Sequence, residues 1–239
     1  MFDESKHPRD NDGKFTDEDN FGGSSNGDKL FKAVSEYKSN DLKSKIDSTQ
    51  KKIKQLEAFN DKSKSLQQII DQTGYTKERA EKVYDTIKYY TSAGYGEIRK
   101  NKESENAKII EDFIQKHPKF DGIVYRGVGF ENQKGKDYLN DLLYSKSHNL
   151  PIDMGGISSW SSEESIAQDF ADNRNKANDS YRFIFETDNK SGVGIDHLSN
   201  WVGESEVLHS NKTKYAVKNI LEIENGNSPL YKIIVEEVW

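Results

Sequence analysis

The hydrophobic pattern of the chain changes at Pro118, and this change limits the classes of fold that are possible. Before Pro118, apolar residues recur at intervals of three or four, as on one face of a helix; Ala107, Ile110 and Ile114 are an example. After it come short segments that alternate or are rich in β-branched and aromatic residues, which is typical of strands. These segments are 122–127, 181–187, 201–209, 214–223 and 231–238. Helices that precede strands, instead of alternating with them, predict an α+β fold.

Local signals predict where individual helices begin and end. Thr76 is expected to cap a helix that Gly94 and Gly96 interrupt, and a further helix is expected from Ser104 until Pro118. Between the later strands, the run Ser161–Glu164 has the pattern of a capping box and predicts a short helix after it.

The first 28 residues differ in composition from the rest. They hold eight acidic residues against three basic ones, a net charge of −5 out of −6 for the whole chain of 239 residues. Their apolar residues are only Met1 and three Phe, and they end in a Gly/Ser-rich run at 22–27. Such a segment buries too little apolar surface to offset the entropy of ordering it. Residues 1–28 are therefore predicted to be a flexible acidic arm.

A narrow apolar stripe follows the arm. Its members lie four and three residues apart: Leu42, Ile46, Thr49, Ile53 and Leu56. The stripe spans barely two heptads, which is short for a free coiled coil. We therefore expect residues 29–72 to form an accessory helical segment that packs on the main domain. The main domain is then expected over residues 73–239.

Composition excludes several classes of protein. The absence of cysteine excludes disulfides and thiolate zinc sites. The five histidines have no metal-binding spacing, so no metal is expected. The net charge of −6 argues against capture of nucleic acid. No apolar run is long enough to span a membrane, and no Sec signal peptide is recognisable. A soluble protein is expected.

Three local patterns carry candidate chemistry. Arg126, at the end of a strand and beside Gly127, suits a phosphate clamp, although a surface arginine at a strand end is the commoner explanation. The serine-rich run 158–162 also fits ordinary turn and capping chemistry. Glu204 and Glu206 would face the same side of a strand, which is unfavourable unless a cationic substrate or transition state lies there. Each pattern is weak by itself.

Taken together, Arg, Ser-x-Ser and Glu-x-Glu resemble the arginine–serine–glutamate class of mono-ADP-ribosyltransferases, which includes binary-toxin enzymatic subunits and phage ADP-ribosyltransferases. The segments 89–98 and 157–161 are similar to the same family, and the resemblance covers residues 73–239. It implies N-terminal helices followed by a mostly antiparallel, two-sheet β core.

The resemblance also implies an activity, the transfer of ADP-ribose from NAD to arginine side chains with release of nicotinamide. Glu206 would be the catalytic carboxylate, and Glu204 would orient the acceptor guanidinium. Ser159 and Arg126 would complete the catalytic group, and Trp201 with Glu204 would recognise the target. NAD would be the co-substrate, with no metal. The residues implied to bind it are Arg126, Gly127, Ser159, Ser161, Phe170, Arg174, Tyr95 and Glu206.

Some of these roles have alternatives, and two residues depart from the family pattern. Lys176 could serve in place of Arg174, Phe170 could be a core contact, and Tyr95 could serve packing alone. Trp160 stands where the family commonly has Thr, and altered packing is expected there. Arg99 stands where relatives often have Asn, which leaves one contact to NAD in doubt.

The implied partners are a target protein with an acceptor arginine and a phage-particle or delivery partner bound through residues 1–72. The arm segment 7–16 resembles junctions in phage head-associated proteins. The protein would be a toxin or phage effector that acts in the cytoplasm of a target or host cell, secreted or phage-delivered without a Sec signal, with NAD glycohydrolysis as a side activity. The alternative is a catalytically weak or inactive phage-particle-associated binding module with a transferase fold.

Overall fold

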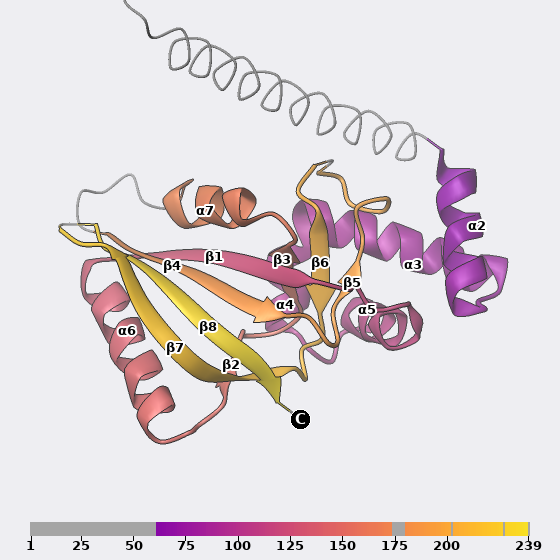
Figure 1. The fold of residues 1–239 in the computed structure, drawn as a ribbon. Helices are drawn as coiled ribbons and strands as arrows, with labels where there is room; N and C mark the ends of the chain where they lie inside the picture. Colours follow the sequence, from indigo (N-terminus) through magenta and orange to yellow (C-terminus); the bar gives the residue numbers. More distant parts are fainter. Residues whose placement is uncertain (1–60, 174–179, 202, 227, 239) are drawn as a thin grey trace, which may run out of the picture. The chain divides into compact units, whose positions relative to one another are not determined.

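The computed structural model describes residues 61–173, 180–201, 203–226 and 228–238, and its secondary structure is mixed α+β, as predicted (Figure 1). Among these residues, four helices and one π-helical turn precede the first strand. They are α2 (Lys62–Thr73), α3 (Lys77–Tyr89), the π-turn η2 (Tyr90–Gly94), α4 (Tyr95–Lys100) and α5 (Glu105–Lys116). Two more helices lie between strands, α6 (Asn132–Ser147) and α7 (Glu164–Asn173). The predicted arm and residues 29–60 of the accessory segment lie outside the described residues.

The predicted cap at Thr76 and the predicted helix start at Ser104 are confirmed. The hydroxyl of Thr76 accepts from the amide of Arg79, and that of Ser104 accepts from the amide of Ala107. The predicted break at Gly94 and Gly96 is wrong, because the chain continues from α3 through η2 into α4 without leaving helical geometry. Gly94 is needed for packing instead: a Cβ there would lie 2.4 Å from the ring of Tyr89.

The strands of the described residues form one eight-stranded sheet in the order β2-β7-β8-β4-β1-β3-β6-β5. The pairing of β4 with β8 is parallel, and the other pairings are antiparallel. The strands are β1 (Ile123–Glu131), β2 (Ile152–Asp153), β3 (Ser158–Ser161), β4 (Ser180–Asp188), β5 (Val193–Gly194), β6 (Glu206–His209), β7 (Lys214–Glu224) and β8 (Leu230–Val238).

The expected division into two sheets is not found. The strands do form two groups, β2-β7-β8-β4-β1 and β3-β6-β5, but Tyr125 of β1 pairs with Ser161 of β3 and so joins the groups into one sheet. The sequence could not show this, because a single shared pair leaves no trace in the periodicity of either strand.

Helices α6 and α7 cover opposite faces of the larger strand group. On β4, Phe183 and Phe185 belong to the core cluster that includes α6, whereas Ile184 packs with Ala167 and Ala171 of α7. Successive side chains of a strand point to opposite faces, so the two helices lie on different sides of the sheet. A separate cluster joins α2, α3 and α5 to the smaller strand group. Within the described residues, no helix is both long and apolar enough to cross a membrane.

Candidate active site

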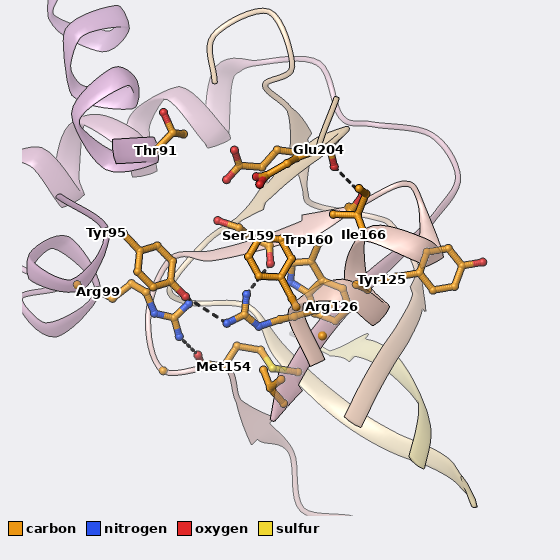
Figure 2. Close-up of a pocket in the computed structure, with 18 of the residues that line it drawn as sticks. Thr91, Tyr95, Arg99, Tyr125, Arg126, Met154, Ser159, Trp160, Ile166 and Glu204 are labelled. Carbon is orange, nitrogen blue, oxygen red and sulfur yellow. Dashed lines mark hydrogen bonds between the residues drawn. The ribbon is translucent and has the colours of Figure 1, made fainter. Parts of the chain in front are cut away.

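A cleft of about 840 Å³ opens where the two strand groups meet (Figure 2). Its walls come from η2 and α4 on one side, from β1 and α7 on the other, and from β3 and the segment before β6 between them. Residues that are far apart in the sequence therefore face one open cleft, which is the usual arrangement of a small-molecule site.

Glu206, the first residue of β6, lines this cleft although only 6% of its surface is exposed. Burial raises the pKa of its carboxyl from 4.5 to about 7, and the negative charges of Glu204 and Asp196 act in the same direction. Hydrogen bonds from Ser159 and Ser199 oppose the shift because they stabilise the charged form. The result is a carboxyl group that changes charge near neutral pH.

Glu204 also lines the cleft, but it does not lie on a strand with Glu206 as predicted. The strand begins only at Glu206, and Ser205 between them has a φ of +47°. This left-handed conformation replaces the regular alternation, so Glu204 belongs to the preceding loop, where it is half-buried. Partial burial raises the pKa of the Glu204 carboxyl. The two carboxyl groups thus line one cleft, but Glu204 comes from a loop and Glu206 from a strand.

The two serines of β3 contact different parts of the site. The hydroxyl of Ser159 lies 3.0 Å from the hydroxyl of Tyr90 and bonds to the carboxylate of Glu206. The hydroxyl of Ser161 donates to the carbonyl of Glu204 at 2.6 Å and accepts from the amide of Glu163 at 3.0 Å. Ser161 therefore fixes the backbone of the loop that carries Glu204.

Trp160, between these two serines, is buried on the other side of the strand. Its ring packs against His209 and Tyr215, and its indole N–H donates to Ser158. The tryptophan thus serves packing, as expected at this departure from the family pattern, and the two serine hydroxyls remain directed toward the site.

Arg126 of β1 lies at the floor of the cleft. Its guanidinium donates to the carbonyl of Ser159 and lies 3.5 Å from the hydroxyl of Tyr95 (Figure 2). The ring of Tyr95 packs against that of Tyr90, with 5.5 Å between their centroids. A positive charge, two phenol rings and a serine hydroxyl are therefore neighbours in the part of the cleft opposite Glu204.

Gly127 allows helix α7 to approach β1. A Cβ at this position would lie 1.7 Å from the carbonyl oxygen of Ala167, so any side chain would displace the helix. Phe170 of the same helix is 47% exposed and lines the cleft, so it is not the core contact considered as its alternative role. Arg174 and Lys176 lie outside the described residues.

Arg99 fastens the segment before β3 to helix α4. Its guanidinium donates to the carbonyls of Met154 and Ile157 and packs over the ring of Tyr95 at 5.1 Å (Figure 2). These bonds commit two of its donor nitrogens to the backbone. Arg99 thus supports the strand that carries Ser159.

Ser199 and Asn200 are neighbours of Glu206 and the cleft that the sequence did not predict, and Thr91 lies in the segment 89–98 that resembles the family but had no role assigned to it. Ser199 donates to Glu206 at 2.9 Å, and Asn200 bonds to Thr91 through its amide and its side chain, at 3.0 Å each. The indole N–H of Trp201 donates to the carbonyl of Thr91 at 2.7 Å, although 61% of the surface of Trp201 is exposed. The residue types and spacing here match no catalytic pattern, so only the fold could reveal them.

No cluster of three or more histidine or carboxylate side chains that could hold a metal ion occurs in the part of the chain that the structure describes. The polar groups that face the cleft are suited to an organic ligand with both anionic and hydroxyl groups. Arg126, Arg99 and Lys100 supply positive charges, and Ser159 and Glu206 supply a hydroxyl and a carboxyl group.

A comparison with protein-family models finds no match, and a comparison with curated protein sequences finds none either. Among solved structures, the chain is similar to ADP-ribosyltransferases. The toxin Plx2a from Paenibacillus larvae is 19% identical with a TM-score of 0.49, and the match covers 78% of this chain and 97% of that one. An ADP-ribosyltransferase from Clostridium botulinum is 18% identical with a TM-score of 0.48, covering 71% and 92%. The Vis toxin from Vibrio splendidus is 18% identical with a TM-score of 0.47, covering 75% and 87%.

Proposed function

We propose that this protein transfers ADP-ribose from NAD to arginine side chains of target proteins and releases nicotinamide. The observation that carries the proposal is the buried Glu206, whose carboxyl has a pKa of about 7 and is held by two serine hydroxyls at the edge of a cleft that also contains Arg126 and Glu204. These residues are those of the Arg, Ser-x-Ser and Glu-x-Glu pattern in the sequence. The structure brings them to one place from three separate strands and loops.

The chemistry of the transfer explains why a buried carboxylate is useful here. When the bond between nicotinamide and ribose breaks, positive charge develops on the ribose ring. A carboxylate in a poorly solvated position stabilises such charge better than one in water, because less solvent screens the interaction. Glu206 in its ionised form would serve this role and accept a hydrogen bond from a ribose hydroxyl. The hydroxyl of Ser159 would keep the Glu206 carboxylate oriented.

Glu204 would act on the acceptor. It is half-buried at the cleft, in the loop whose backbone Ser161 holds. A carboxylate can bind a guanidinium through paired hydrogen bonds and take up its proton as the new N–C bond forms. The reaction then balances, because NAD and arginine give ADP-ribosyl-arginine, nicotinamide and one proton. With water as the acceptor the same site would hydrolyse NAD.

The cleft also fits the other groups of NAD. Arg126 would bind the diphosphate, because a guanidinium pairs well with phosphate oxygens. The exposed ring of Phe170 would pack on the nicotinamide, and Tyr95 would line the opposite wall. Trp201, exposed beside Glu204, would contact the target protein. We further propose that the protein acts inside a target or host cell as a toxin or phage effector.

The test separates the two carboxylates. Purified protein is incubated with NAD labelled in the adenine half, with a small guanidine or a bacterial lysate as acceptor, and nicotinamide release and label transfer are measured together. Glu206→Gln should lower both by about a hundredfold or more. Glu204→Gln should lose transfer and keep most of the nicotinamide release. Glu222→Gln, which removes a charge from the exposed part of β7, should change neither.

A wild-type protein that neither binds NAD nor releases nicotinamide would overturn the proposal. Transfer to a side chain other than arginine would overturn the acceptor assignment and leave the rest in place.

A further inference from the structure

Ser199 connects the carboxylate of Glu206 to the backbone of the loop ahead of it. Its side chain is fully buried, donates to Oε2 of Glu206 at 2.9 Å and accepts from the amide of Trp201 at 3.1 Å. The amide of Trp201 is a donor only, so the hydroxyl proton of Ser199 remains available for the carboxylate. The direction of this hydroxyl therefore depends on where the Trp201 backbone lies.

Thr91 holds the same segment from the opposite side. Its hydroxyl donates to the carbonyl of Ile87 at 3.0 Å and accepts from both the amide and the side chain of Asn200, at 3.0 Å each. The carbonyl oxygen of Lys88 also lies 3.4 Å from this hydroxyl oxygen, so the proton is directed at the helix backbone while both lone pairs are used by Asn200. The carbonyl of Thr91 accepts from the indole of Trp201. Thr91 lies in the π-turn η2, a type of irregularity that is frequent at functional sites.

The segment Ser199–Trp201 is thus held between Glu206 and the helical side of the cleft. Besides Thr91 of η2, Lys88 of α3 holds it, because its carbonyl accepts from the Asn200 side chain at 2.5 Å and its ammonium donates to the carbonyl of Ser199 at 3.3 Å. We propose that Thr91 is a positioning residue for Glu206, because it fixes Asn200 and thereby aims the Ser199 hydroxyl at the carboxylate. The part of this proposal that concerns catalysis rests on the proposed function, in which Glu206 is the catalytic carboxylate. The positioning itself rests only on the hydrogen bonds.

Weakening this connection should change the titration of Glu206. The Ser199 bond stabilises the charged carboxylate and so opposes the rise in pKa that burial causes. Loss of this bond should therefore raise the pKa of Glu206 further. The other titratable groups that act on Glu206 are Glu204 and Asp196, which lie in the same β5–β6 connection as Ser199, and Tyr90 of η2. Ser199→Ala removes the bond directly, so it shows how much of a Thr91→Val shift comes from the Ser199 bond.

The first experiment measures nicotinamide release against pH for Thr91→Val, which keeps the shape and removes the hydroxyl, and for Thr91→Ser, which keeps the hydroxyl. Thr91→Val should lower kcat about tenfold and move the acidic limb upward by about half a pH unit or more, with the KM for NAD changed less than about threefold. Thr91→Ser should restore the wild-type profile, and Ser199→Ala should resemble Thr91→Val. A Thr91→Val profile that coincides with the wild type, or a Thr91→Ser variant as impaired as Thr91→Val, would overturn the proposal.

The second experiment needs no catalysis. Trp201 bonds to both Ser199 and Thr91, so its fluorescence, taken as the difference between the wild type and Trp201→Phe, should titrate together with Glu206. The titration should disappear in Glu206→Gln and move to higher pH in Thr91→Val, or in Ser199→Ala if Thr91→Val does not fold. A Trp201 signal that is independent of pH would count against the positioning role. An NAD-inactive wild type that still titrates would reject the proposed function and keep the positioning role.

Discussion

The guanidinium of Arg126 donates a hydrogen bond to the carbonyl of Ser159, next to the pair Tyr125–Ser161 at which β1 and β3 meet. The two strand groups share little backbone pairing at this junction. A side chain at the floor of the cleft therefore contributes to holding the halves of the sheet together, and the same side chain brings a positive charge into the cleft.

We expect Arg126→Lys to show both contributions. A lysine ammonium cannot reproduce the planar fork that reaches Ser159 and Tyr95 and also pairs with a diphosphate. The KM for NAD should rise about tenfold or more, and the thermal midpoint should fall by a few degrees. Arg79→Lys is the matched control, because Arg79 pairs with Asp112 on the helical side of the molecule, and it should leave the KM unchanged. An unchanged KM in Arg126→Lys would contradict the role in binding.

The activity should depend on pH through the ionisation of Glu206. The carboxylate is the useful form, and it predominates only above the pKa of about 7 to which burial raises this group. At saturating NAD, nicotinamide release should fall about tenfold for each pH unit below this midpoint and reach a plateau above it. An acidic limb with a midpoint near 4.5, the ordinary value for a glutamate, would show that Glu206 is solvated in the working protein.

The same raised pKa predicts that the ionised form of Glu206 lowers the free energy of unfolding at alkaline pH. Between pH 4.5 and about 7 the folded protein binds a proton that the unfolded chain releases, so the free energy of unfolding falls as the pH rises through this window. Glu206→Gln removes the ionisable group. It should therefore raise the free energy of unfolding by about 1–3 kcal/mol at alkaline pH and by little at pH 4.5.

Chemical denaturation at the two pH values measures this difference. The exposed Glu222→Gln variant should show the same stability change at both. Equal effects of Glu206→Gln at both pH values would mean that its carboxyl titrates normally.

Gly127→Ala should destabilise the fold strongly. The added methyl group would lie 1.7 Å from the carbonyl of Ala167 and would force α7 away from β1, which should cost at least about 2 kcal/mol in unfolding free energy. Gly96→Ala is the control within the same cleft, because a Cβ there meets nothing within 4 Å and alanine favours the helix α4. Urea unfolding of both variants tests this, and equal stability would show that α7 can shift at little cost.

The fold class and most strands could be predicted because their signals are local. The alternation at 181–187, 214–223 and 231–238 predicted β4, β7 and β8 to within one residue at each end. Helix α6 was not predicted. Apolar residues such as Leu143 and Tyr144 lie on its exposed side, so its apolar residues do not follow a clear helical period. Its Gly135, close to the start of the helix, adds a residue that disfavours helix.

The sequence predicted several residues of the candidate site but not the hydrogen bonds that connect them. Arg126, Ser159 and Glu206 come together as the family pattern implied. The strand geometry predicted for Glu204 failed, because the left-handed turn at Ser205 depends on tertiary contacts such as the bond from the amide of Ser162 to its carbonyl. Thr91 contacts Asn200, which is 109 residues away in the sequence, and Ser199 contacts Glu206, which is seven residues away. Only the fold makes these contacts, so the sequence could not predict them.

Ser205 separates two carboxyl groups that are subject to different constraints. Glu206 belongs to a buried strand, whereas Glu204 lies outside the strand and is only half-buried at the cleft. If the proposed function holds, a substitution at Glu204 alone would alter which acceptor is chosen, while the strand that carries the buried carboxylate stays unchanged. The choice of target would then be separable from the cleavage of NAD.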